Sequence, residues 1–330
     1  MNIFVRSLLP RAWRVAFCAL AITLLVPGLA PAQPTDRPVR ILVGFAPGGT
    51  ADVVARMVAD KLKDSLGVPV IVENRAGATG RIAAEALKNS PADGSVLLLA
   101  PIGTVVVAPQ AYKSNPFDTL KDFAPLSLAA RLHLAIAVAN NTPAKTLKEY
   151  IAWTKANKDK AFYATSGAGT LPHFLGLLLA REAGVELTHV PYKGAAAYQG
   201  ELVSGMIPAA FDAMGDLSEL HKAGKVRILA TSGSTRSGAM ADIPTMREEG
   251  FNVVGDAWFG FFAPSGTPKV VLDKYAAAIR LAVNASDVAP KLANLNMEPV
   301  GSTPEEFATV VRADWDKWGA VVKASGFTAD

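Results

Sequence analysis

The chain has little cysteine and little charge, and it has no long apolar run beyond its first 32 residues. Cys18 is the only cysteine among 330 residues, which excludes a disulfide framework and the cysteine-rich zinc and iron–sulfur sites. The four histidines, at positions 133, 173, 189 and 221, lack the close spacing of zinc ligands. Charged residues make up 19% of the chain and apolar residues 50%, which excludes a disordered chain and a polybasic nucleic-acid binder. We therefore expect packed apolar cores and no metal, cofactor or nucleic-acid partner.

The first 32 residues have the layout of a secretory signal peptide. Three arginines precede an uncharged run over residues 15–26, and Ala30 and Ala32 are small residues at the two positions that a signal peptidase reads. The apolar run is about a dozen residues long, shorter than the roughly 20 residues of a membrane-spanning helix. We predict cleavage near Ala32 and a periplasmic mature chain that begins near Gln33; the alternative is a retained N-terminal anchor.

The basic character of the chain comes mainly from this leader. Its removal deletes three arginines and no acid, which lowers the formal charge from +4 to +1, and it also removes Cys18. A mature chain without thiols is compatible with an oxidising compartment such as the periplasm. The charge therefore supports no claim about nucleic-acid or membrane surfaces.

Strand and helix patterns alternate along the mature chain. An apolar run over residues 39–45 ends in a glycine turn, and apolar residues at helical spacing follow over residues 54–66. The same patterns predict strands at 70–72, 96–100, 162–165, 187–190, 207–211 and 226–231, and helices at 79–89, 145–157, 175–183, 195–204, 215–222 and 268–284. Residues 132–139 form a crossover stretch between the two series, and residues 259–263 are an apolar run. Alternating strands and helices imply an α/β protein with parallel, doubly wound sheets.

The length of the chain favours two domains. The early part has only three predicted strands, too few for a stable open sheet, whereas the middle part has four. We therefore place the tail back on the early part, which predicts a discontinuous domain 1 over 33–140 and 252–330, and a domain 2 over 141–251. Ligands of such sheets lie outside the carboxyl ends of the strands, so the cleft between the domains is the expected site. A last helix carries an apolar stripe that predicts core packing, formed by Phe307, Val311, Trp315, Trp318 and Val322.

Two glycine loops, over residues 45–52 and 165–173, each join a predicted strand to a predicted helix. The free N–H groups and the positive end of the helix dipole at such a loop can hold a carboxylate without a cationic side chain. The alternative for the first loop is a tight turn with Thr50 as the helix N-cap and Asp52 paired with Arg56. The second loop fails the dinucleotide-binding pattern because it lacks the third glycine.

Other strand ends contribute polar candidates to the same cleft. Asp212 would attract an ammonium or hydroxyl group and disfavour a second carboxylate nearby; alternatively, it caps a helix. His173 is either a structural hydrogen-bonding group or a ligand contact, and Tyr192 is a candidate wall. The candidate ligand-binding residues are Phe45, Pro47, Gly48, Gly49, Thr50, Asp52, Thr104, Ser166, Gly167, Gly169, Thr170, His173, Tyr192 and Asp212.

A secreted hydrolase is an alternative function. Ser166, His173 and Asp212 have the residue types of a hydrolytic triad, but the sequence lacks the G-x-S-x-G elbow and Ser166 precedes its glycines. We therefore expect no enzyme. A further alternative is an adhesive or signalling module with a protein partner.

Five motifs follow one another along the mature chain: residues 45–49 with Asp52, 73–78, 166–170 with His173, 189–194 and 263–268. In this combination and order, the chain resembles the extracytoplasmic solute receptors of tripartite tricarboxylate transporters, also called the Bug family. The resemblance implies a two-domain periplasmic-binding fold of type II, a venus flytrap that closes on a small organic acid gripped between the two glycine loops. It also implies delivery to a tripartite-type membrane permease, or to a sensor protein, and we expect a monomeric receptor.

The chain departs from the family pattern at two places. Thr79 interrupts a usual glycine pair before Gly80, and residues 207–210 replace a more polar pattern directly before Phe211 and Asp212. The second departure adjoins a candidate site residue, so a relative's ligand preference cannot be transferred to this chain. The ligand could be a tricarboxylate, a dicarboxylate, an aromatic acid or an amino acid.

Overall fold

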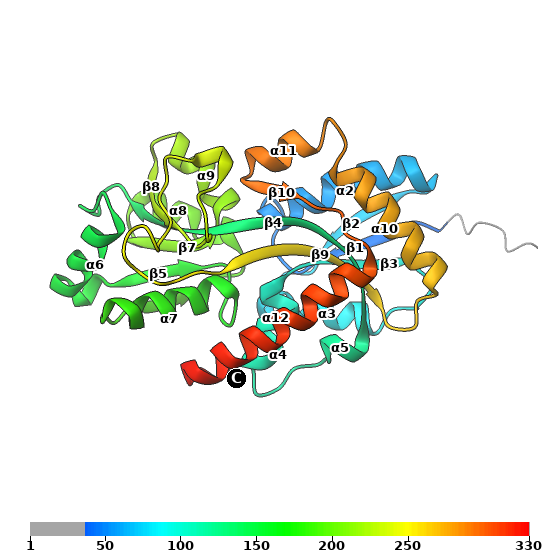
Figure 1. Cartoon of the computed structure of the whole chain (residues 1–330), viewed down its shortest axis with the longest axis horizontal. Helices are drawn as coiled ribbons and strands as arrows, with labels where there is room; N and C mark the ends of the chain where they lie inside the picture. Colours follow the sequence, from blue (N-terminus) through cyan, green and yellow to red (C-terminus); the bar gives the residue numbers. More distant parts are fainter. Residues whose placement is uncertain (1–36, 330) are drawn as a thin grey trace, which may run out of the picture. The chain divides into compact units, whose positions relative to one another are not determined.

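The computed structural model describes residues 37–329 (Figure 1). The signal peptide predicted over residues 1–32 lies outside this part of the chain. Among the described helices, none has the length and apolar character needed to cross a membrane.

The described strands form one continuous mixed sheet. Its order is β2 (Val70–Asn74), β1 (Val39–Val43), β3 (Val96–Pro101), β9 (Asp256–Pro264), β4 (Phe123–Ala139), β7 (Ala209–Ala213), β5 (Phe162–Thr165) and β6 (Thr188–Pro191). Two more strands, β8 (Val226–Thr231) and β10 (Met297–Pro299), also pair with β4 but are not part of this order.

Strand β4 belongs to two halves of this sheet. Its residues 123–133 pair with β9, and its residues 134–139 pair with β7 and β8. We call β1, β2, β3, β9, β10 and the first part of β4 the first half-sheet, and β5, β6, β7, β8 and the last part of β4 the second half-sheet. Figure 1 shows β4 and β9 as two long neighbouring strands that run from one half to the other.

Strand directions follow the prediction only in part. Strand β1 is parallel to β2 and β3, and β5 is parallel to β6 and β7. Strands β9 and β4, in contrast, run antiparallel to their neighbours. The sequence patterns predict no strand over residues 123–139, and residues 259–263 of β9 stand out only as an apolar run. Both strands are buried along most of their length, so their sequences lack the alternation of polar and apolar residues that marks a half-buried strand.

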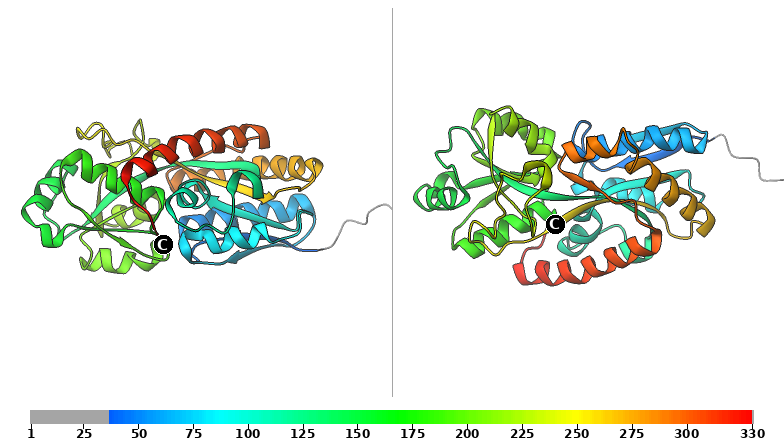
Figure 2. Two further views of the ribbon diagram at one scale, coloured as in Figure 1. Left: turned by 90° about the horizontal axis from the view of Figure 1, so that it is seen from below. Right: turned by 45° about the horizontal axis from the view of Figure 1, so that its top comes forward.

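Helices flank both half-sheets (Figures 1 and 2). Those of the first half are α2 (Thr50–Leu66), α3 (Arg81–Lys88), α4 (Ala108–Ala111), α5 (Thr119–Asp122), α10 (Lys269–Val283), α11 (Ala289–Asn294) and α12 (Pro304–Ser325). Those of the second half are α6 (Leu147–Ala156), α7 (Leu171–Ala183), α8 (Gln199–Ser204) and α9 (Met214–Lys222). Most lie within a few residues of the predicted helices.

Helix α12 packs the tail of the chain onto β4. It begins with a capping box, in which the Thr303 hydroxyl accepts from the Glu306 N–H and the Glu306 carboxylate accepts from the Thr303 N–H. The predicted stripe is confirmed as core: Phe307, Val311, Trp318 and Val322 are buried, and Trp315 is half-buried. The domain bounds 33–140 with 252–330, and 141–251, remain a prediction.

Candidate functional site

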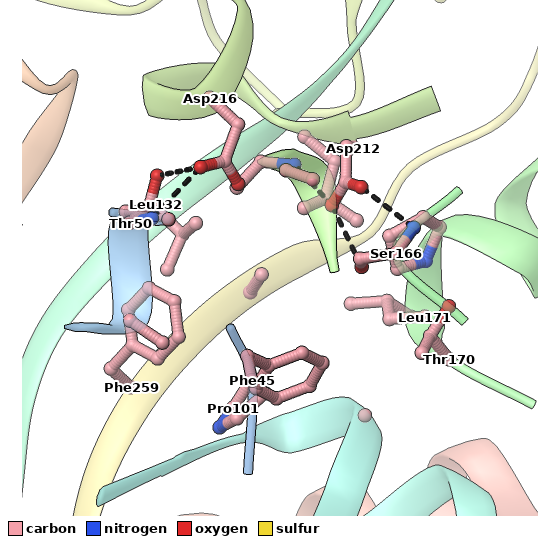
Figure 3. Close-up of a pocket in the computed structure, with 18 of the residues that line it drawn as sticks. Phe45, Thr50, Pro101, Leu132, Ser166, Thr170, Leu171, Asp212, Asp216 and Phe259 are labelled. Carbon is pink, nitrogen blue, oxygen red and sulfur yellow. Dashed lines mark hydrogen bonds between the residues drawn. The ribbon is translucent and has the colours of Figure 1, made fainter. Parts of the chain in front are cut away.

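A cavity lies where loops of the two half-sheets meet (Figure 3). Its empty space is about 610 Å³ with the open mouth included. Much of its wall is apolar, with Phe45, Leu132, Trp258 and Phe259 among the lining side chains. Polar groups enter it from the first turns of α2, α7 and α9 and from the end of β7.

The first glycine loop brings backbone donors to this cavity. Gly48 has a φ of 86°, a conformation that favours glycine, and its N–H donates to the Asp52 carboxylate over 3.0 Å. Gly49 is the N-cap of α2. Gly49 and Ala51 line the cavity, and their N–H groups have no hydrogen-bond acceptor in the described part of the chain. This is expected for the first turn of a helix. The positive end of α2 therefore offers two donors at the cavity wall.

The second glycine loop brings a backbone N–H donor to the cavity from the other half-sheet. Thr170 is the N-cap of α7, and its hydroxyl accepts from the His173 N–H and donates to the Gly167 carbonyl. The N–H of Leu171 has no acceptor among residues 37–329, and Leu171 lines the cavity (Figure 3). Two helix N-termini thus converge on one cavity, and their dipoles favour an anion there.

Two carboxyl groups, Asp212 and Asp216, lie side by side along one edge of the cavity, across from Phe45 and Pro101 (Figure 3). Asp212 is the next-to-last residue of β7, and it accepts from the Ser166 N–H over 2.8 Å and from the Ser166 hydroxyl over 3.1 Å. It also accepts from the Ala213 N–H over 2.9 Å. The second glycine loop is therefore held against β7 by a carboxylate of the protein itself.

Asp216, in the first turn of α9, bridges the two half-sheets. Its Oδ1 accepts from the Thr50 N–H over 2.8 Å and from the Thr50 hydroxyl over 2.5 Å. Its carboxylate thereby occupies one of the free donors at the start of α2. Asp216 remains half-buried, and it lines the cavity.

Both carboxyl groups have raised pKa values. Burial, with the neighbouring charge of Asp216 as the second cause, raises the pKa of Asp212 to about 7. Burial also raises the pKa of Asp216, although the hydrogen bonds from Thr50 act in the opposite direction. Within the described part of the chain, no lysine, arginine or histidine lines the cavity. The two acids therefore face the ligand space without a cationic side chain to offset them.

Six of the predicted ligand-binding residues line this cavity: Phe45, Gly49, Thr50, Ser166, Thr170 and Asp212. Gly167 and Tyr192 line a neighbouring hollow that also reaches Phe45 and Ser166. The other six lie outside the lining of both spaces: Pro47, Gly48, Asp52, Thr104, Gly169 and His173.

Asp52 is engaged inside the first loop. It accepts from the Arg56 guanidinium over 2.9 Å and from the Asn74 amide over 2.9 Å, in addition to the Gly48 N–H. Burial alone would raise the pKa of Asp52, but these hydrogen bonds outweigh it and lower the pKa. The structure therefore contains the Asp52–Arg56 pair that the sequence offered as the alternative to ligand contact.

His173 is engaged away from the cavity. Its ring stacks on His189 with centroids 3.9 Å apart, and its Nδ1 accepts from the Gly169 N–H over 3.2 Å. Burial lowers the pKa of His173 to about 4, so the imidazole is neutral near pH 7. Because His173 bonds to Gly169 and not to Ser166, the residues Ser166, His173 and Asp212 do not form a linked triad.

Asp216 is the cavity residue that sequence reasoning missed. It follows Asp212 by four residues and looks like an ordinary acid in the first turn of a helix, where acids are common. Its partner, Thr50, lies 166 residues earlier in the chain. The apolar walls Leu132 and Trp258 were missed for a related reason, since they belong to the strands β4 and β9 that the sequence did not delimit.

Comparison with known proteins shows the same architecture. Residues 54–327 match the family described as "Tripartite tricarboxylate transporter family receptor". Protein BugT of Bordetella pertussis is 31% identical over 313 residues, which cover 93% of this chain and 96% of BugT. The structure of the periplasmic binding protein BugD is similar with a TM-score of 0.85 and 30% identity, over 89% of this chain and 99% of BugD. MatC from Rhodopseudomonas palustris, solved with bound malate, has a TM-score of 0.82 and 31% identity, over 87% of this chain and 99% of MatC.

These similarities confirm the predicted fold class, a two-domain periplasmic-binding fold of type II in which each half is a sheet flanked by helices. They extend over nearly the full length of the relatives. The chain belongs to the receptor family of the tripartite tricarboxylate transporters, the Bug family.

Proposed function

We propose that this chain is a periplasmic receptor that captures a small organic carboxylate in the cavity of Figure 3 and delivers it to a tripartite-type membrane permease. The observation that carries the proposal is the convergence of two helix N-termini on that cavity, with unpartnered N–H groups on Gly49, Ala51 and Leu171 among the described residues. Such groups hold a carboxylate without a side-chain cation. The malate bound to MatC supports a carboxylate as the ligand.

Contacts between the half-sheets suggest how ligand binding changes the receptor. Thr79, at a left-handed φ of 60°, donates its hydroxyl proton to the Ala168 carbonyl over 2.7 Å, and the Tyr112 hydroxyl donates to the same oxygen over 3.1 Å. Asp216 and Thr50 add a second link. A ligand that touches α2 and α7 together would add contacts found only in the closed arrangement, and only such a preference can shift the population toward closure.

Delivery, compartment and site residues belong to the same proposal. The predicted signal peptide over residues 1–32 and the family of periplasmic receptors support a periplasmic location. A closed receptor presents a changed surface to a permease or, in the second candidate function, to a sensor protein. The proposed ligand contacts are the cavity-lining residues Gly49, Thr50, Ser166 and Asp212, with Phe45 as a wall.

The proposed function is tested by ligand-dependent melting of residues 33–330, unfolded and refolded to remove any bound ligand. Each carboxylate of a panel is compared with its amide or ester, because a ligand that binds only the folded state raises the melting temperature by mass action. We expect at least one acid to raise it while its neutral analogue does not. Equal shifts from acid and amide, or no shift from any acid, would contradict the proposal.

A further inference from the structure

The cavity combines features that a simple dicarboxylate does not match. At one edge it has N–H donors of Gly49 and Ala51 that have no acceptor among residues 37–329, and next to them are two carboxyl groups, Asp212 and Asp216. No cationic side chain in the described part of the chain lines it. A ligand with negative charge at both ends would bring one of its charges against two acids, and like charges repel.

The hydrogen bonds of the two acids leave capacity for a ligand. Asp212 accepts through both oxygens, from Ser166 and Ala213. Asp216 accepts from Thr50 through Oδ1 only, among the hydrogen bonds within residues 37–329. A carboxylate has room for about four donors, so Asp216 retains most of its accepting capacity at the cavity.

The Asp216 carboxylate lies close to the N–H donors at the start of α2. Asp216 Oδ1 lies 2.8 Å from the Thr50 nitrogen. Thr50 stands between Gly49 and Ala51, whose N–H groups have no acceptor in the described part of the chain and can hold an anion. The site for a positive group and the site for a negative group are therefore adjacent. An α-amino acid carries its ammonium and carboxylate on one carbon and matches this arrangement.

We propose that the ligand is an α-amino acid, with its carboxylate at the N-termini of α2 and α7 and its ammonium group between Asp212 and Asp216. This inference rests on the proposed function and narrows the class of carboxylate. The fully buried Tyr198, which lies close enough to both acids for their charges to affect it, stays neutral because burial raises its pKa far above 10. Tyr198 therefore adds no third negative charge beside the two acids. The apolar walls Phe45 and Phe259 face the rest of the ligand.

The test uses acids that differ only by an α-amino group: aspartate and succinate, glutamate and glutarate, phenylalanine and 3-phenylpropionate. Affinities are measured calorimetrically at pH 8 for the refolded protein and two variants. Asp216→Asn keeps an oxygen for both Thr50 hydrogen bonds and removes the charge. Glu219→Gln removes the same charge one turn later on the exposed face of α9 and serves as the matched control.

We expect the amino acid of at least one pair to bind at least tenfold more tightly than its deaminated partner. Asp216→Asn should reduce that ratio to threefold or less, and Glu219→Gln should leave it unchanged. Tighter binding of the deaminated acids, or a preference that survives Asp216→Asn, would overturn the inference and leave the carboxylate receptor intact. Binding of no acid of either kind would overturn the inference together with the proposed function.

Discussion

Raising the pH from 5 to 8 should destabilise the unliganded protein through Asp212, and Asp212→Asn should abolish this contribution. The pKa of Asp212 is about 7 in the folded chain and about 3.9 in an unfolded one. Between these values the folded state holds a proton that the unfolded state has released, so the free energy of unfolding falls as the pH rises. From pH 5 to pH 7 the free energy of unfolding falls by about 1.4 kcal/mol for each of two pH units, or roughly 3 kcal/mol in all.

Three histidines act in the opposite direction in part of the same range. Burial lowers the pKa of His133, that of His173 to about 4 and that of His189 to about 3, so below about pH 6.5 the unfolded chain binds more protons at these positions. Their contribution stabilises the protein as the pH rises. The informative quantity is therefore the difference between variant and wild type, in which the histidines cancel.

The assay is urea unfolding of wild type, Asp212→Asn and the exposed control Glu219→Gln at pH 5 and pH 8. Asp212→Asn keeps one carbonyl oxygen and loses the other as an acceptor for Ser166 at both pH values, so that loss largely cancels between them. We expect the stability of Asp212→Asn relative to wild type to improve by roughly 3 kcal/mol between pH 5 and pH 8, and that of Glu219→Gln to stay constant. An unchanged relative stability of Asp212→Asn would refute the raised pKa.

Three substitutions test the site and the core. Gly49→Val should weaken carboxylate binding more than tenfold, because its methyl groups would crowd the N–H donors of α2. The protein should still fold, because a Cβ at position 49 meets no atom closer than 3.7 Å. Gly200→Val, in open space on α8, is the control for the calorimetric measurement. Thr79→Val removes the hydroxyl that donates to Ala168, which should favour opening by about 1 kcal/mol and speed amide hydrogen exchange over residues 166–170. Phe307→Ala should lower the urea-unfolding free energy by about 3 to 5 kcal/mol, since its ring is buried against Trp258 and Phe262.

The sequence predicted elements wherever a local signal exists. Glycine turns and helical spacing located α2 to within a few residues, and β5 and β8 match their predicted bounds. Strand β4 was missed because most of its 17 residues are buried, so its sequence lacks a sustained alternation of polar and apolar residues. Its antiparallel pairing with β9 joins segments more than 100 residues apart, which no local pattern encodes.

The same limit applies to the site. The two glycine loops were predictable because their N–H donors follow from the local order of strand, glycine turn and helix. They do not depend on which part of the chain lies opposite. The role of Asp216 depends on α9 meeting the start of α2, which is a property of the assembled fold. Asp212 was predictable as a strand-end acid, but its raised pKa needs the burial and the neighbour that only the fold supplies.

Strand β4 has a consequence for how the molecule unfolds. Because its first part pairs in one half-sheet and its last part in the other, neither half is complete without a backbone segment that the other also uses. A fragment cut at the predicted domain bounds would leave one half without its central strand. The two halves should therefore lose structure in a single cooperative transition, although the receptor has the outline of two independent modules.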